Sequence, residues 1–269
     1  MARAPGSQVT PNGLLVLARD LAIRVGDTAL AGRRNGLRHV DTKSTPTDMV
    51  TEFDRATEVE IVSTLRRLRP DDAIVGEEGA DHDGSSGITW FIDPIDGTTN
   101  FLYDLPLWAV SIAACDANGP LCGVVHAPAL RETFTAVRGG GAQLNGRTIR
   151  CGSVSELSQA LVATGFNYSA DNRLKQAARF PRMIDKIRDI RRFGAASLDL
   201  CFVACGRYDA YFEEHLYSWD TAAGSLIAAE AGAQLGSIDG TEPIPSAILA
   251  ANPALFSQIQ RLVFEANIV

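Results

Sequence analysis

The pattern of apolar residues changes near position 150, and this change limits the possible folds more than any other feature of the chain. Between residues 107 and 137, short apolar or alternating runs are separated by Gly, Asn and Pro, which predicts a meander of antiparallel strands. After residue 151, apolar strands alternate with helical segments, a pattern typical of a layered α/β lobe. We therefore expect two lobes, 13–150 and 151–269, and because no flexible linker separates them, we expect a site between them.

The same patterns predict the individual elements. Residues 1–12 are polar and rich in Pro and Gly, which predicts disorder, and residue 13 begins an amphipathic helix that runs to about residue 34. A second helical pattern stops before Pro70, because proline cannot continue a helix. The glycines of 138–147 favour a hairpin with an Asn145-Gly146 turn over a phosphate-binding loop, because the strand and helix of such a loop are missing. The remaining expected elements are strands at 73–79, 88–93, 160–166, 190–194 and 209–213, and helices at 171–188, 195–206 and 220–232.

Charge and apolar content narrow the class of protein. The chain has 269 residues, of which 46% are hydrophobic, so it can bury a sizeable core. Its net charge of -7 argues against nucleic acid and anionic membranes as partners. No apolar run approaches the roughly 18 residues of a membrane-spanning helix. The five cysteines form neither a disulfide framework nor a CxxC pair, which favours a reduced, cytoplasmic protein, and Cys201 and Cys205 are expected to pack in the core.

Two acids lie three residues apart at the end of a predicted strand, in the segment DPIDGTTN. Pro94 fixes one backbone angle and Gly97 permits a conformation that other residues resist, so this turn can direct Asp93 and Asp96 toward one point. An isolated Asp-Gly pair is usually an ordinary solvated turn. Here an apolar strand precedes the acids and hydroxyl or amide side chains follow them, which weakens that explanation.

Other acids stand at the ends of neighbouring elements, and each has a simple structural explanation by itself. Glu77 and Glu78 end the preceding strand and could form a solvated loop. Thr47 or Asp48 could be the N-cap of the second helix, and Asp54 lies near the start of that helix. Asp220 precedes TAAG and could cap the helix that it opens.

Together these acids require positive charge, because carboxylates that converge in one cleft repel one another. Lys43 is the main candidate base nearby, and a divalent cation would neutralise the converging carboxylates better. Oxygen ligands without a His or Cys cluster favour Mg²⁺ or Mn²⁺ over zinc. A magnesium site that keeps several waters suits a phosphorylated substrate.

The segments WFIDPIDGTTNF (90–101) and WDTAAG (219–224) resemble the two signatures of the inositol monophosphatase family. GEEG (76–79), STPTDMVTEFD (44–54) and DAYFE (209–213) stand in the order and spacing that the family shows, and the resemblance covers residues 36–250. It implies a layered α/β/α/β/α sandwich of the sugar-phosphatase type. It further implies a homodimer that depends on two or three Mg²⁺ ions, is inhibited by Li⁺, and acts on a small phosphorylated polyol or sugar.

Carried over residue by residue, the resemblance implies a ligand set for these ions. One metal would be held by Glu77, Asp93 and the backbone carbonyl of Ile95. A second would be held by Asp93, Asp96 and Asp220, so that Asp93 bridges the two. A third, weaker ion would use Glu77 and mostly water.

The resemblance also implies roles in the reaction. Thr98, backed by Asp54, and Glu77 would orient and deprotonate a metal-bound water for attack on phosphorus. The backbone N–H groups of Gly97 and Thr98 would hold phosphate oxygens. The contacts implied for the alcohol half of the substrate are Asp96, Ala196, Glu213 and Asp220.

The leading prediction is a Mg²⁺-dependent phosphomonoesterase for inositol 1-phosphate or a closely similar polyol phosphate. Glu214-His215-Leu216, after Glu213, does not match the inositol-specific members, which leaves the sugar preference open. The alternatives within the class are phosphatases for histidinol phosphate, fructose 1,6-bisphosphate or a 3'-phosphonucleotide. An alternative from another class is a regulatory binding protein that retains the fold.

Overall fold

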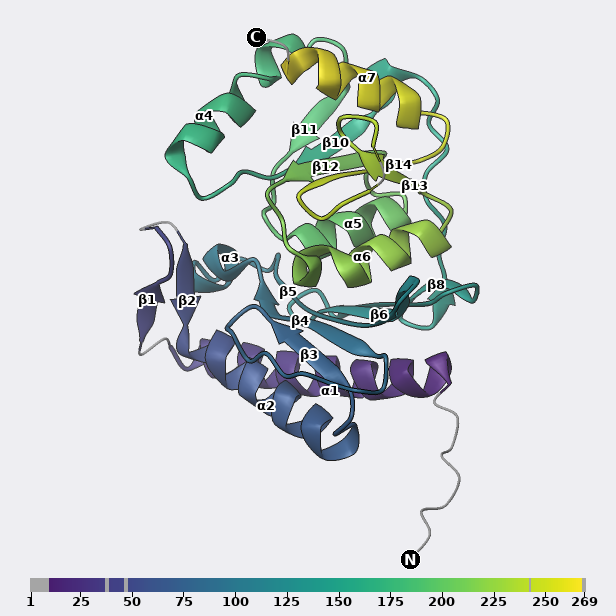
Figure 1. Ribbon diagram of the computed structural model, residues 1–269. Coiled ribbons are helices and arrows are strands. Elements are labelled where there is room, and N and C mark those ends of the chain that lie inside the picture. The colour runs from purple at the N-terminus through teal and green to yellow at the C-terminus, as the bar shows by residue number, and fades with distance from the viewer. Residues whose placement is uncertain (1–9, 37–38, 46–47, 242, 268–269) are drawn as a thin grey trace, which may run out of the picture.

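Two large sheets alternate with three layers of helices, beside a small two-stranded sheet, in the computed structural model, which describes residues 10–36, 39–45, 48–241 and 243–267 (Figure 1). The helices are α1 (Pro11–Arg34), α2 (Glu52–Leu68), α3 (Thr98–Leu102), α4 (Ala170–Ala177), α5 (Ala196–Ala204), α6 (Ser218–Glu230) and α7 (Phe256–Asn267). The strands of the first half are β1 (Val40–Thr42), β2 (Met49–Thr51), β3 (Ala73–Gly76), β4 (Thr89–Asp96), β5 (Ala109–Asp116), β6 (Gly119–Ala127), β7 (Glu132–Val137), β8 (Gly141–Leu144) and β9 (Arg147–Thr148). Those of the second half are β10 (Leu161–Thr164), β11 (Asp189–Arg191), β12 (Ala210–Glu214), β13 (Gln234–Ser237) and β14 (Ala247–Ala251), with 3₁₀ turns η1 (Leu157–Gln159) and η2 (Phe180–Arg182).

The layers follow one another in the order that the family resemblance predicts. Helices α1 and α2 cover the outer face of a seven-stranded sheet of order β3-β4-β5-β6-β7-β8-β9. Helices α5 and α6 lie between this sheet and a five-stranded sheet of order β11-β10-β12-β14-β13. Helix α7 covers the far face, with α4 beside it (Figure 1). The expected α/β/α/β/α sandwich is confirmed.

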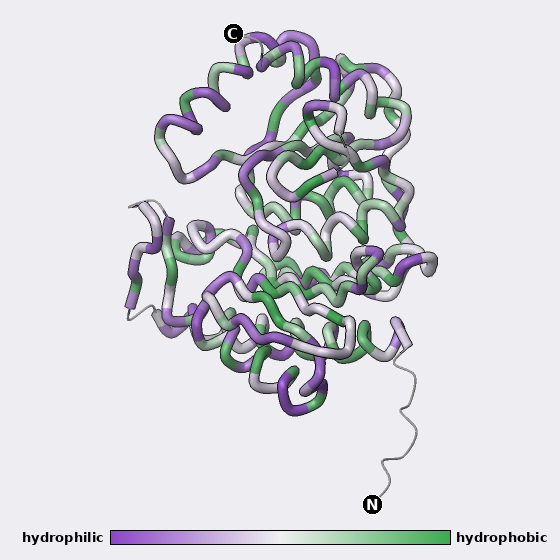
Figure 2. Tube along the Cα trace, in the orientation of Figure 1, coloured by the Kyte–Doolittle hydropathy of each residue, from purple (hydrophilic) through white to green (hydrophobic). Residues whose placement is uncertain are grey.

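The first sheet is covered on both faces, which explains the continuous apolar runs of its central strands. Every residue of β5 except its last is buried. One core cluster joins α1 and α2 to one face of this sheet, and a second joins α5 and α6 to the other face. A third lies under α7, against the second sheet. Figure 2 shows the same distribution, with hydrophobic segments concentrated in the strands and in the helices between the sheets.

Helix α1 begins at Pro11, two residues earlier than the periodicity predicted. Thr10 is the N-cap, and its Oγ1 accepts a hydrogen bond from Gly13 N at 3.2 Å. Pro11 is tolerated because the first N–H groups of a helix have no partner within it. The disorder expected for residues 1–12 therefore does not extend to Pro11 and Asn12, and residues 1–9 lie outside the described residues.

The helix predicted over 171–188 is wrong in length. Helix α4 ends at Ala177, and the chain then turns through η2. Pro181 explains this end, because a proline ring clashes with the carbonyl four residues before it, here that of Ala177.

The smaller expectations have mixed outcomes. Asn145 and Gly146 both have positive φ, 50° and 76°, which confirms the hairpin between β8 and β9. Cys201 is buried and Cys205 is half-buried against the same core cluster, and both thiols are free. None of the described helices is long and apolar enough to cross a membrane.

Candidate active site

The first acids of the site lie side by side because β3 and β4 are parallel neighbours. Gly76 at the end of β3 pairs with Ile92, and Glu77 N donates a hydrogen bond to Ile92 O at 3.2 Å. Glu77 therefore lies next to Asp93, and Asp93 is only 1% exposed. Carboxyl ends of parallel strands are a common location for ligands in such folds.

The turn after Asp93 is built by local hydrogen bonds. The pairing of β4 with β5 shifts register between Asp93 and Asp96, where Pro94 has no N–H to donate. Asp93 Oδ1 accepts from Ile95 N at 3.0 Å, while the Ile95 side chain is fully buried. Gly97 has a φ of 89°, and a Cβ there would lie 3.1 Å from Leu107 O, so this position requires glycine on both counts.

Asp96 reaches across to the other lobe. Its Oδ1 accepts from Ala196 N at 3.0 Å, and its Oδ2 accepts from Ser197 N at 2.7 Å and Ser197 Oγ at 2.5 Å. The carboxylate thus caps the N-terminus of α5, where backbone N–H groups lack helical partners. This contact joins residues one hundred positions apart, and it places Ala196, one of the predicted substrate contacts, directly beside the acids.

Thr98 and Asp54 form the pair that the sequence predicted. Thr98 Oγ1 lies 3.0 Å from Asp54 Oδ1 and 3.1 Å from Ile95 O, and its single proton can be donated to either. Asp54 is fully buried, and its Oδ2 accepts from Thr51 N at 2.8 Å and Thr51 Oγ1 at 2.5 Å. Asp54 therefore also completes the capping box of α2.

The prediction that Thr47 or Asp48 caps α2 is wrong. Thr51 is the N-cap, with its side chain accepting from Phe53 N. Asp48 instead accepts from Ser44 N at 3.2 Å and Ser44 Oγ at 2.6 Å, in the connection between β1 and β2. Thr47 lies outside the described residues.

Two predicted residues come from the second lobe. Asp220 is the third residue of α6, and its Oδ2 accepts from Tyr217 N at 2.6 Å, as expected for a helix-capping acid. Glu213 on β12 is 8% exposed and its Oε2 accepts from Tyr211 OH at 2.6 Å. A Cβ at Gly165 would clash with the Glu213 carboxylate, so the glycine makes room for this side chain.

The acids are close enough to raise one another's pKa. Burial, and then the charges of Glu77, Asp96 and Asp220, raise the pKa of Asp93 well above its usual range. Burial and Glu77 do the same for Asp220. Burial also raises the pKa of Glu77 and Asp96, although Lys43 opposes this for Glu77 and the Ser197 hydrogen bonds oppose it for Asp96.

Lys43 is a partner of the acids rather than a solvated loop lysine. Its Nζ lies 2.8 Å from Glu77 Oε1 and also pairs with Glu78, with 23% of its side chain exposed. Burial lowers the pKa of Lys43, but Glu77 and Glu78 more than offset this and raise it. One lysine shared by two glutamates leaves Asp93, Asp96 and Asp220 without a compensating base in the described contacts.

Sequence reasoning missed Glu58, which holds the loop after β3. Its Oε2 accepts from Glu78 N at 2.9 Å and its Oε1 from Ala80 N at 3.1 Å, and the residue is 2% exposed. A Cβ at Gly76 would lie 2.5 Å from Glu58 Oε2. The available signal was its position four residues after Asp54 on α2, which puts both acids on one helix face.

The donor set fits a hard divalent cation. Within the described part of the chain, no three acidic, His or Cys side chains already converge tightly enough to hold an ion. The clustered donors are nonetheless all oxygen, Asp93 and Asp96 are buried and Glu77 and Asp220 half-buried, and burial together with mutual repulsion raises the pKa of Asp93 and Asp220, which a bound cation would relieve. Asp96 and Asp220 already accept hydrogen bonds from backbone N–H groups at helix N-termini. To bind an ion, each carboxylate must share these oxygens between the N–H groups and the ion, or rotate.

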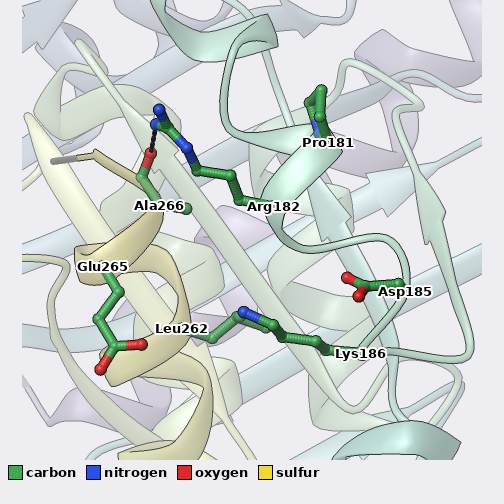
Figure 3. A pocket seen from close by; sticks show the side chains of 7 residues that line it. All are labelled: Pro181, Arg182, Asp185, Lys186, Leu262, Glu265 and Ala266. Atoms are coloured by element: carbon green, nitrogen blue, oxygen red, sulfur yellow. Dashed lines mark hydrogen bonds between the residues drawn. The ribbon is translucent and has the colours of Figure 1, made fainter. Parts of the chain in front are cut away.

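A surface pocket lies elsewhere and contains none of the predicted residues. It has a volume of about 250 Å³ and lies between η2 and the end of α7 (Figure 3). Two basic residues, Arg182 and Lys186, and two acidic residues, Asp185 and Glu265, line it, and Arg182 points toward Ala266, where its Nη1 donates to the carbonyl oxygen at 3.0 Å. Its charges offset one another, so we do not assign the reaction to this pocket.

Comparison with known proteins agrees with this geometry. The profile of the Inositol monophosphatase family matches residues 12–265 of the chain. The chain is 49% identical over 205 residues to "Inositol-1-monophosphatase SuhB" of Mycobacterium tuberculosis, which covers 73% of this chain and 71% of that protein. It is 44% identical over 221 residues to "Nus factor SuhB" of Pseudomonas aeruginosa, covering 79% of this chain and 81% of that protein.

The fold has a similar solved counterpart. The crystal structure of extragenic suppressor protein suhB from Bartonella henselae superposes with a TM-score of 0.87 at 32% identity, covering 93% of this chain and 98% of that one.

Proposed function

We propose that this chain, which belongs to the inositol monophosphatase family, hydrolyses inositol 1-phosphate or a closely similar polyol phosphate to the alcohol and inorganic phosphate. A member of this family is a phosphoric monoester hydrolase. The observation that carries the proposal is the meeting of Glu77, Asp93, Asp96 and Asp220 beside the Thr98–Asp54 pair.

The family is typically metal-dependent, and the all-oxygen donor set supports two or three Mg²⁺ ions in this chain. Glu77, Asp93 and the carbonyl of Ile95 would hold one ion. Asp93, Asp96 and Asp220 would hold another, and Glu77 with water a third. When bound, such ions lower the pKa of a coordinated water and neutralise the leaving oxygen.

The chain's own residues orient the water. When Thr98 donates its hydrogen bond to Asp54, the lone pairs of Oγ1 remain free to accept a hydrogen bond from the water and so orient it. Burial, opposed by the Thr51 hydrogen bonds, raises the pKa of Asp54 to about 6, so Asp54 is mostly ionised and an acceptor at neutral pH. Glu77, held by Lys43, would take one proton from this water as general base, and the water's other proton stays on the attacking oxygen.

The phosphate would be held from the first lobe and the alcohol mainly from the second, with Asp96 added from the first. Gly97 and Thr98 offer backbone N–H groups at the start of α3. Ala196, Glu213, Asp96 and Asp220 would contact the alcohol half. We propose on this basis that the lobe 13–150 supplies most metal ligands and the lobe 151–269 supplies Asp220 and the substrate contacts.

The test is phosphate release by the purified protein with Mg²⁺ or with EDTA, across inositol 1-phosphate, fructose 1,6-bisphosphate, histidinol phosphate and 3'-phosphoadenosine 5'-phosphate. We expect Mg²⁺-dependent turnover, fastest on inositol 1-phosphate and inhibited by LiCl. Asp93→Asn and Asp220→Asn should each abolish turnover, and should each remove the rise in Tm that Mg²⁺ gives the wild type. No phosphate release from any of these compounds would reject the enzyme, and normal kcat in either variant would reject the ligand set.

A regulatory role is the second candidate, because one relative at 44% identity is named a Nus factor. It would not require the acids, so it predicts that Asp93→Asn keeps the role. For quaternary structure, the family resemblance supports a homodimer, which sedimentation velocity would test.

A further inference from the structure

Glu213 faces the layer of helices between the two large sheets. Alternate residues of a strand point to the same face, so Glu213 shares its face of β12 with Tyr211. Tyr211 belongs to the core cluster that also contains Ala196, at the start of α5, where a backbone N–H donates to Asp96. Phe212, between the two, belongs instead to the cluster under α7. The strand therefore directs the Glu213 carboxylate toward the layer that contains the N-terminus of α5 and its bound acid.

The two oxygens of this carboxylate have different surroundings. Tyr211 OH donates a hydrogen bond to Glu213 Oε2 at 2.6 Å. Among the described residues, Oε1 accepts no hydrogen bond, and it is not one of the fully buried polar atoms that lack a partner. Oε1 is therefore the oxygen that a ligand can reach.

Tyr211 is fixed well enough to hold the carboxylate in one orientation. It is 0% exposed, and it lies opposite Ala163 of β10 on one side and Ala250 of β14 on the other. A Cβ at Gly165 would lie 1.9 Å from Glu213 Oε2, so the carboxylate lies directly against the backbone there. The glycine and the tyrosine together leave the carboxylate little room to rotate.

The hydrogen bond also favours the form of Glu213 that accepts from an alcohol. Burial raises the pKa of Glu213 to about 7, and the hydrogen bond from Tyr211 is the largest influence that lowers it. An ionised carboxylate only accepts hydrogen bonds, whereas a polyol hydroxyl can donate one. The single proton of Tyr211 OH is already donated to Oε2, so Tyr211 acts on a substrate through Glu213.

We propose that Tyr211 is a positioning residue for substrate recognition, because its hydroxyl holds Glu213 Oε2 and so presents Oε1 to a hydroxyl on the alcohol half of a polyol phosphate. This inference deepens the proposed function and rests on it, since Glu213 meets the alcohol only when the phosphate occupies the acidic site. It places part of the selectivity for hydroxylated substrates in a tyrosine that touches neither the substrate nor the proposed metal ligands.

The test is Tyr211→Phe, which removes the hydroxyl and keeps the ring. Phosphate release is measured at pH 8 with saturating Mg²⁺, and Tm is measured on the same samples. We expect KM for inositol 1-phosphate to rise about tenfold, as for a lost hydrogen bond to a charged group, with kcat within about threefold of wild type. The inhibition constant of inorganic phosphate should stay within about twofold, because inorganic phosphate has no alcohol half.

Tyr208→Phe is the matched control. Tyr208 is 4% exposed in the same core cluster, and its hydroxyl makes no hydrogen bond to Glu213 in the described part of the chain. Its KM should stay within about twofold of wild type.

A double-mutant cycle with Glu213→Ala tests whether Tyr211 acts through Glu213. Glu213→Ala should itself raise KM, and Tyr211→Phe should then change KM by no more than about twofold in that background, because its partner is absent. If the two effects on KM multiply instead, Tyr211 acts independently of Glu213 and the inference is wrong.

The remaining outcomes separate this inference from the function beneath it. If the wild type hydrolyses inositol 1-phosphate and Tyr211→Phe leaves KM unchanged, the inference is wrong and the phosphatase stands. Equal rises in KM and in the inhibition constant of phosphate, or a loss confined to kcat and Tm, would give Tyr211 a purely structural role and also overturn the inference. No turnover of inositol 1-phosphate by the wild type would overturn both.

Discussion

Replacing Thr98 with valine tests the water-orienting pair without removing a charge. Valine keeps the branched shape and deletes the hydroxyl that lies 3.0 Å from Asp54 Oδ1. Thr98 is 6% exposed and Asp54 fully buried, so water cannot freely replace the lost donor. A buried charged acceptor that loses its donor destabilises a protein by about 1.5–3 kcal/mol. For a chain of this length that corresponds to a fall in Tm of about 3–5 °C.

The effect on turnover should be much larger than the effect on stability. If Thr98 orients the water from which Glu77 takes a proton, Thr98→Val should lower kcat by about 10²–10⁴-fold, the usual contribution of positioned proton transfer. KM should change little, since the backbone N–H of residue 98 remains. Thr98→Ser restores the hydroxyl and should recover kcat to within about tenfold of wild type.

The assay is steady-state phosphate release at pH 8 and saturating Mg²⁺, where Asp54 is ionised, with Tm measured on the same samples. A folded Thr98→Val protein with kcat within about threefold of wild type would show that Thr98 is only a turn residue, because general-base positioning is worth far more than that. Equal losses in the Val and Ser variants would trace the effect to packing of the methyl group instead.

Three further changes test other parts of the site. Burial raises the folded pKa of Glu213 from 4.5 to about 7, so the stabilisation that this carboxyl gives is complete below pH 4.5 and is lost as pH rises through 7. The free energy of unfolding of Glu213→Gln should therefore be close to that of the wild type at pH 5 and exceed it by up to about 3 kcal/mol at pH 8, measured by calorimetry without metal. Equal stability of the two proteins at pH 8 would contradict this. Glu58→Gln places an amide N–H opposite one of the two loop N–H groups from which the Glu58 carboxylate accepts hydrogen bonds. We expect the variant to lose about 1–3 kcal/mol of stability in urea titrations and to have a lower kcat. Glu60→Gln is the control, because Glu60 lies on the same helix with 40% of its side chain exposed, and it should change neither quantity. Gly97→Ala adds a Cβ at a φ of 89° and 3.1 Å from Leu107 O, so we expect about 1–3 kcal/mol of destabilisation. Phosphate binding should also weaken, which would be measured as a higher inhibition constant for inorganic phosphate. An unchanged Tm would show that the turn can relax.

Local sequence signals predicted the elements that depend on neighbouring residues. The strand from Ala73, the strand before Asp93 and the helix near Asp220 follow from apolar runs, glycines and capping acids, although β3 ends at Gly76, before the predicted end at 79, and α6 begins at Ser218. The helix expected over 171–188 failed where a local signal was overlooked, since Pro181 forbids continuation past Ala177. The cap expected near Asp48 failed because Thr51 with Asp54 forms the complete capping box.

Contacts between distant segments could not be predicted from local patterns. Asp96 accepts hydrogen bonds from the backbone N–H groups of Ala196 and Ser197 because the two lobes pack together. The residues around either segment contain no sequence signal that predicts this contact. Lys43 reaches Glu77 from the connection between β1 and β2. The ligand roles of the acids remain predictions, since they came from the resemblance and the structure shows only where the side chains lie.

The hydrogen bonds between Asp96 and the N-terminus of α5 affect how such an enzyme could be re-engineered. Under the proposed function, groups for the phosphate come mainly from before residue 100, whereas Ala196, Glu213 and Asp220 would contact the alcohol from the second lobe. A chimera that exchanged residues 151–269 for those of a relative could therefore change the substrate while keeping the hydrolytic half. The junction that such a chimera must preserve is not the covalent link near residue 150, but the fit between one carboxylate and two backbone amides.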